Sequence, residues 1–179
     1  VSEANNLVPL LRELLSPSRV GKSSLRTWTV LERASTDPRF KKHIGKMLND
    51  MLVEVTQAVQ DQATDSGNPD LTVGYTKFLT SILPQINPDI THEAEQKLPK
   101  GDHLTAFLGY ELAKHATNTT KPTEQDPETT QATYASRQLS LGVRLAELAS
   151  YDQALIHTKK AVAIYWHLAK VNPIFMFSA

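Results

Sequence analysis

The stretch QLSLGVRLAELASYDQAL, residues 138–155, decides the fold expected of this chain. Apolar residues recur in it at spacings of three and four, as they do on one face of an amphipathic α-helix. The spacing continues on both sides of Ser150 and predicts two helices, roughly Glu128 to Ala149 and Tyr151 to Val171. Two helices with almost no residues between them form an αα-hairpin.

Small residues mark the place where these two helices are expected to cross. Gly142 and Ala154 allow the backbones to approach closely, and larger apolar side chains fill the space around them. The residues predicted to pack the hairpin are Leu141, Gly142, Leu145, Tyr151, Ala154 and Ala161. The apolar stripe of the second helix has two sides, so it needs another neighbour besides the first helix. That neighbour is either the rest of the chain or a second copy of the chain, through self-association of the hairpin.

The hairpin resembles a tetratricopeptide repeat, in particular the longer kind found in kinesin-light-chain-like and in fungal or bacterial signalling proteins. The matching positions are Leu141-Gly142, Leu145, Tyr151, Ala154 and Ala161. The sequence departs from the pattern at Gln138 and Thr158, where aromatic residues are usual, and at Ala149, where the turn glycine is usual. The resemblance is confined to residues 129–179.

The resemblance implies a protein-binding module whose first helix lines a concave face. We therefore expect exposed polar side chains of that helix to contact a partner, namely Arg137, Gln138, Arg144 and Glu147. One repeat cannot bury both of its faces, since arrays generally need about three units. Either the preceding helices act as degenerate repeats or as a cap, or the array continues beyond Ala179. The apolar segment Pro173 to Phe177 then begins the next helix or folds back as a plug.

The N-terminal part, residues 1–115, is predicted to form a bundle of about six helices, because apolar residues recur at helical spacing throughout it. The helices expected are a leucine stripe from Leu7 to Leu15, Ser23 or Ser24 to about Ala34, one opened by Asp37-Pro38, one capped by Asp70, one opened by Asn87-Pro88, and one capped by Asp102 with Leu104, Phe107, Leu108 and Leu112 inward. No segment shows the alternation of a strand. The fold class predicted is therefore all-α, a helical bundle or α-solenoid of about eight helices.

The segment between the two parts, residues 116–128, is rich in threonine and interrupted by proline. It contains no large apolar residue and cannot bury enough surface to offset the entropy of ordering it. We predict a polar linker or mobile loop that divides the chain into 1–115, 116–128 and 129–179.

Composition excludes several classes of function. The chain has 19 basic and 19 acidic residues, which gives no overall attraction to nucleic acid or to a membrane surface. The absence of cysteine excludes disulfides, thiolate metal sites and a cysteine nucleophile. No apolar run approaches the roughly 20 residues that span a bilayer, and no signal-peptide layout opens the chain. We expect a cytoplasmic protein without a cofactor or bound metal.

An all-helical hydrolase or nuclease is one alternative to a binding module. Its histidine and carboxylate candidates are His103, Glu111 and His115, which one helical face could carry, although turn and capping roles explain them more simply. The segment RVGKSS, residues 19–24, looks like the end of a phosphate-binding loop. Residue 16, where the first glycine of that motif belongs, is serine, Pro17 lies inside the loop, and the preceding segment is a leucine-rich helix in place of a strand.

A nucleic-acid-binding helical protein is the second alternative. The basic residues that would contact phosphates are Arg19, Lys22, Arg26, Arg39, Lys41, Lys42, His43 and Lys46. They lack interleaved exposed aromatic residues, and helices ordinarily carry such charges on a solvated face. The sequence therefore favours a non-enzymatic module that binds a protein or peptide partner.

Overall fold

The computed structural model describes residues 9, 13–16, 19, 25–118 and 121–172, and within them the prediction of an all-α fold is confirmed. The described part contains no strand. Its helices are α3 (Leu25–Ala34), α4 (Pro38–Ser66), α5 (Pro69–Ile82), the 3-10 helix η1 (Leu83–Gln85), α6 (Pro88–Lys97), α7 (Ala106–Thr117), α8 (Glu128–Glu147) and α9 (Tyr151–Val171).

Capping side chains set where the longer N-terminal helices begin. Asp37 accepts a hydrogen bond from the backbone N–H of Arg39 at the start of α4, and Asn87 caps α6 in the same way. The helix α5 differs from the sequence prediction, because its cap is Asn68 and not Asp70. Proline at the first helical position follows each of these three caps and fixes the backbone angle that a helix requires.

The start of α7 also corrects the sequence prediction. The side chain of Asp102 accepts hydrogen bonds from Leu104 N–H and from the Thr105 hydroxyl, so it stabilises a turn that precedes the helix. The helix itself begins at Ala106. Phe107, which was expected to face inward, is 53% exposed because it lies on the side of α7 opposite the buried residues Leu112 and Ala116.

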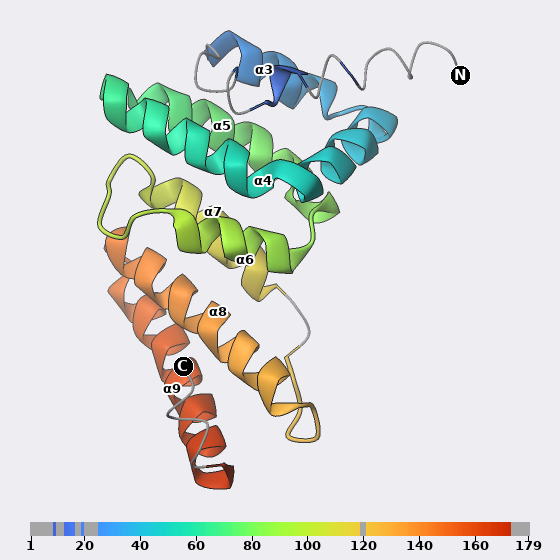
Figure 1. Cartoon of the computed structure of the whole chain (residues 1–179). Helices are drawn as coiled ribbons and strands as arrows, with labels where there is room; N and C mark the ends of the chain where they lie inside the picture. Colours follow the sequence, from blue (N-terminus) through green and yellow to red (C-terminus); the bar gives the residue numbers. More distant parts are fainter. Residues whose placement is uncertain (1–8, 10–12, 17–18, 20–24, 119–120, 173–179) are drawn as a thin grey trace.

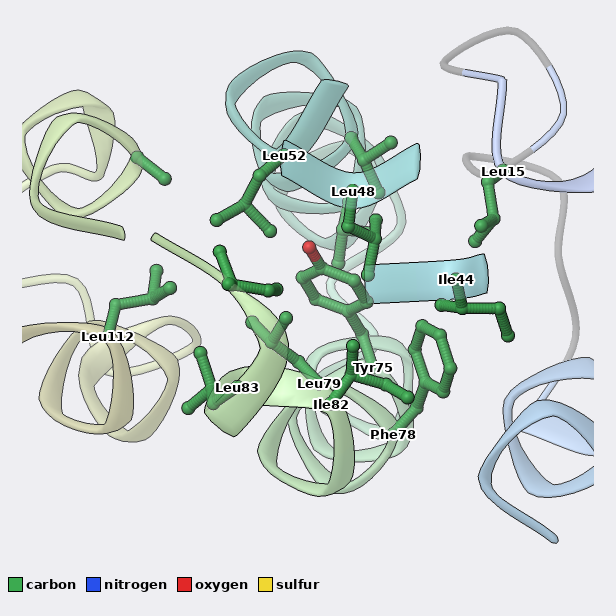
Figure 2. Close-up of a cluster of buried hydrophobic side chains, with 14 of the residues drawn as sticks. Leu15, Ile44, Leu48, Leu52, Tyr75, Phe78, Leu79, Ile82, Leu83 and Leu112 are labelled. Atoms are coloured by element: carbon green, nitrogen blue, oxygen red, sulfur yellow. The ribbon is translucent and has the colours of Figure 1, made fainter. Parts of the chain in front are cut away.

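The main core lies between α3, α4, α5, α6 and α7. Figure 2 shows Tyr75 and Phe78 of α5 pointing toward the leucine and isoleucine side chains of α4. The Trp28 ring of α3 closes this layer, with its centroid 5.1 Å from that of Tyr75 and 5.7 Å from that of Phe78. The buried Tyr75 hydroxyl is paired with Thr56 Oγ1 at 3.0 Å, and this hydrogen bond offsets the cost of burying the polar atom.

The helices stack as successive antiparallel pairs (Figure 1). The pair α4/α5 contacts the pair α6/α7, and α7 contacts α8 of the last pair. The C-terminal hairpin is therefore packed on the N-terminal helices, and the chain described between α7 and α8 is a surface loop. Most of the leucine stripe from Leu7 to Leu15, the segment 20–24 and the tail 173–177 lie outside the described residues.

None of the helices in the described part is both long enough and apolar enough to cross a membrane.

Candidate functional site

The crossing of α8 and α9 depends on Gly142. A Cβ atom placed on Gly142 would lie 2.6 Å from Thr158 Oγ1 and 3.2 Å from the carbonyl oxygen of Ala154. These distances are shorter than van der Waals contact, so the two helices can approach this closely only where a side chain is missing. The loop between them contains Ala149 with φ of 58°, a left-handed conformation at the position where a turn glycine is usual.

Five of the six residues predicted to pack the hairpin lie in or near this interface. The buried ones are Leu141, Gly142, Leu145, Ala154 and Ala161. Tyr151 corrects the prediction, because its side chain is 68% exposed. Its position gives the reason: Tyr151 is the first residue of α9, and helix side chains lean toward the N-terminus, so its ring lies at the end of the hairpin, beyond the packed turns around Ala154 and Ala161.

The residues expected to contact a partner are mostly internal, and this is the largest correction to the sequence analysis. Arg137, Gln138 and Arg144 are 7%, 3% and 0% exposed, respectively, and Glu147 is partly buried. They were expected on a free concave face, but α7 packs against α8, and Arg144 on that side of α8 is hydrogen-bonded to α6 and the residue that follows it. A residue at the centre of this contact cannot meet a partner without unfolding.

Arg144 joins the hairpin to α6 through a fully used guanidinium group. Its Nε donates to Glu95 Oε1 at 2.7 Å, and its Nη1 donates to Glu147 Oε2 at 2.9 Å. The remaining donors reach the backbone carbonyls at the end of α6, namely those of Glu95, Leu98 and Pro99. Arg144 therefore satisfies both a buried carboxylate and the orphan carbonyl groups of a helix C-terminus.

Glu95 stays ionised inside this contact. Burial by itself would raise the pKa of Glu95, but hydrogen bonds and charges from Lys100 and Arg144 outweigh burial and hold that pKa below its ordinary value. The arrangement is a buried ion pair whose partners leave few polar atoms unsatisfied, as such pairs require.

Polar residues continue along the rest of the contact between α6 and α8. Asp89 pairs with Arg137, Gln96 donates to Ser140 Oγ at 2.6 Å, and His92 Nε2 is 3.3 Å from Ser136 Oγ. A sequence signal for this contact exists, because Arg137, Ser140 and Arg144 recur at spacings of three and four on one face of α8. Arg137 and Arg144 of this set were instead expected to be exposed partner contacts.

A groove of about 410 Å³ lies between α7, α8 and α9. Leu141 and Leu145 of α8 form its apolar floor together with Tyr110 of α7. The other lining residues are Lys114, Thr117, Asn118, Gln138, Gln153 and His157. Gln138 is therefore the one residue among the four expected partner contacts that lines this groove, where its Oε1 atom is 2.7 Å from His157 Nδ1.

The electrostatics of the groove favour a negatively charged group. Lys114 lies on the rim with its Nζ atom 5.3 Å from the centroid of the Tyr110 ring and 3.7 Å from Oε1 of Glu111. Glu111 is not among the lining residues, so an acidic group in the groove would compete with it for Lys114. Burial, and to a smaller extent the charge of Lys160, lowers the pKa of His157. At neutral pH the groove thus combines an apolar floor, neutral hydrogen-bonding groups and one cation.

Three histidines predict how stability depends on pH. Burial lowers the pKa of His92, His115 and His157 below the unfolded value of 6.5. As the pH falls below 6.5, the unfolded chain binds protons that the folded chain does not, so the free energy of unfolding decreases until each folded pKa is reached. We expect a loss of about 1 kcal/mol between about pH 7.5 and pH 5.5, measured by urea unfolding.

The His115→Gln variant should show a smaller loss over the same range, because one of these groups is removed. Thr133→Gln on the exposed part of α8 is the control, because it introduces the same side chain without removing a histidine, and it should leave the slope unchanged. A wild-type stability that rises on acidification would contradict the prediction.

The residues of the catalytic alternative have separate partners. His103 is exposed in the turn before α7, Glu111 lies 3.7 Å from Lys114, and His115 Nδ1 is 3.2 Å from Thr91 Oγ1. No group of three or more metal-binding side chains of the histidine and carboxylate kind occurs in the part of the chain that the structure covers.

The basic residues of the nucleic-acid alternative lie mainly at the start of α4. Arg39 is paired with Asp37 and Arg19 with Glu13, whereas Lys42 and Lys46 are exposed. Lys22 lies outside the described residues.

Comparison of the chain with protein-family models, with curated proteins and with solved structures found no match.

Proposed function

We propose that this protein is a non-enzymatic helical-repeat module that binds a peptide in the groove between α7, α8 and α9. The observation that carries the proposal is the apolar floor of Leu141 and Leu145 beneath a rim that contains a cation and no carboxylate. The ligand of complementary chemistry is a peptide with an apolar anchor side chain close to an acidic residue.

The geometry of the groove supports this ligand class. A mostly apolar concavity with a few polar groups is the usual form of a site that buries one anchor side chain. Lys114, Gln153 and His157 stand around the floor, where they can meet the backbone and the acidic group of a bound segment. The tetratricopeptide resemblance supports the same class of function, and the groove replaces the buried polar face of α8 as the proposed place of contact.

Selection from a displayed library of random peptides on the immobilised full chain tests the proposal. We expect enrichment of peptides that share one apolar position and a neighbouring acidic position. Lys114→Glu reverses the charge of the rim and should weaken binding of a selected peptide by about tenfold at low salt, measured by isothermal titration calorimetry. Exchange of the apolar anchor for serine in the peptide should abolish detectable binding.

Lys77→Glu on the exposed side of α5 is the matched control, since it makes the same charge change away from the groove. It should leave the affinity unchanged. The proposal fails if no peptide consensus emerges, or if selected peptides bind Lys114→Glu and Lys77→Glu equally well. It also fails if the anchor position of the peptide can be replaced without loss.

A further inference from the structure

The last helix pair carries an apolar surface on the side away from the groove. Its residues are Leu139 and Val143 of α8, and Tyr151, Leu155, Val162 and Trp166 of α9, with exposed fractions between 37% and 68%. We call these six residues the end face. Together they amount to half of the large hydrophobic side chains that are exposed in the described part of the chain. Apolar surface gathered in this way on a soluble domain marks an interaction site.

Helical periodicity places the end face and the groove on different sides of the last helix pair. The groove residues Gln153 and His157 lie on one side of the seam where α9 meets α8, and the end-face residues of α9 lie on the other side. On α8, Leu139 and Val143 likewise lie across the seam from Leu141 and Leu145. The end face is thus separate from the groove, and the inference below does not rest on the proposed function.

The end-face residues of α9 are spaced identically whether the helix is followed from its N-terminus or from its C-terminus. Tyr151, Leu155, Val162 and Trp166 are separated by four, seven and four residues, so their midpoint lies between Thr158 and Lys159. Thr158 is the residue that contacts Gly142, which itself lies between Leu139 and Val143. The α8 pair has its midpoint at Leu141, one residue from Gly142, so the end-face residues of α8 and α9 are centred at nearly the same level of the hairpin.

A pattern of this kind is self-complementary. In an interface with two-fold symmetry, residue i of one copy contacts residue j of the other, and j contacts i. When α9 packs antiparallel against α9 of a second copy, each Tyr151 lies opposite a Trp166 and each Leu155 lies opposite a Val162. Leu139 and Val143 of the two copies pair in the same way beside them.

Charges at the ends of α9 favour the antiparallel direction. The Nζ atom of Lys170 lies 3.3 Å from the centroid of the Trp166 ring, which brings its charge back to the level of Trp166. In the antiparallel arrangement that level faces the first turn of the other α9, where Asp152 is exposed. A parallel arrangement would bring each Lys170 to the other Lys170. Lys159 lies at the edge near the midpoint, where its long side chain can reach solvent.

The size of the end face is also adequate for a weak to moderate dimer. Specific interfaces bury at least about 1,000 Å² in total, or about 500 Å² from each partner. Six large apolar side chains, two of them aromatic and more than 60% exposed, can supply an area of that order.

We propose that the end face is the dimer interface of this protein, in which a second copy of the chain packs with α9 antiparallel to α9. Sedimentation velocity of the full chain over a wide concentration range tests this proposal. We expect a reversible change from the monomer to twice its mass. Val162→Glu should raise the dimer dissociation constant at least about 100-fold, because the buried carboxylate enters the symmetric interface twice.

Ile156→Glu is the matched control, because Ile156 is an exposed apolar residue of the same helix that lies off the end face. It should leave the dissociation constant unchanged, and circular dichroism should show both variants folded. A chain that stays monomeric at every concentration overturns the proposal. So does a dimer that Ile156→Glu weakens as much as Val162→Glu does.

Cross-linking tests whether the two α9 helices run antiparallel. The chain has no native cysteine, so a disulfide can form only between the introduced residues. Leu155→Cys and Val162→Cys variants should form a disulfide-linked dimer when mixed, and neither should do so alone. Cross-linking of Leu155→Cys to itself would show a parallel pair and would reject the antiparallel interface. A monomer that dimerises only after deletion of residues 173–179 would identify the tail as the occupant of the face, which also rejects the proposal.

Discussion

Replacing Arg144 with alanine is expected to lower the free energy of unfolding by about 3 to 5 kcal/mol. The variant leaves the buried carboxylate of Glu95 with only the partly exposed Lys100 as a cation, and it removes donors from three carbonyl groups at the end of α6. Loss of one partner of a buried ion pair is costly because the other charge stays in a medium of low dielectric constant. Urea unfolding followed by circular dichroism measures the change.

Two further variants separate the buried pair from a general effect of removing arginine. Arg39→Ala removes an arginine whose ion pair is mostly exposed, and it should change stability by less than about 1 kcal/mol. The double variant Arg144→Leu with Glu95→Leu should recover part of the loss, since neither charge is then left buried alone. An Arg144→Ala variant as stable as Arg39→Ala would show that the contact between α6 and α8 does not depend on this ion pair.

Replacing Gly142 with leucine is expected to cost about 3 kcal/mol, the upper part of the range for overpacking a close contact. The new Cβ would meet Thr158 Oγ1 and the backbone of Ala154, and the rest of the side chain has no space between the helices. The helices α8 and α9 must then move apart, which exposes the small apolar cluster around Leu141 and Leu145. Urea unfolding again gives the magnitude.

The control for position 142 is Thr133→Leu, which places the same side chain on an exposed part of α8 and should change stability by less than about 0.5 kcal/mol. A double-mutant cycle adds a second check. Thr158→Ala removes the nearest atom, so Gly142→Ala should cost less in that background than in the wild-type chain. Equal costs in both backgrounds would mean that Thr158 is not the obstacle.

Local signals in the sequence were sufficient for the helices themselves. Asp37-Pro38 and Asn87-Pro88 specify helix starts through a side-chain cap and a fixed backbone angle, both of which act within three residues. The error at Asp70 has the same physical basis, because Asn68 two residues earlier is an equally good cap and Pro69 follows it directly. The residue at which a helix begins therefore depends on its neighbours in the sequence and can be predicted without the tertiary structure.

The candidate site depended on contacts that local signals do not contain. Arg137 and Arg144 have the sequence context of exposed helix residues, and only the packing of α6 and α7 on α8 makes them internal. Tyr151 shows the opposite error, since an aromatic residue of a repeat pattern was expected inside and lies outside. In each case the burial of a side chain is decided by which element covers it.

The sequence by itself determined that this protein is all-helical, where most of its helices begin, and that Gly142 marks the crossing of the last two. These features follow from the helical period, from capping groups and from the absence of a side chain, all of which act over a few residues. Only the tertiary structure decided that the polar face of α8 is an internal ion-pair layer, that the groove lies on its apolar side, and that the end face is open. The physical reason is that a helix carries several faces of similar chemistry. Residues far away in the sequence decide which face meets a neighbour and which meets solvent, as Glu95 does for Arg144 at a separation of 49 residues.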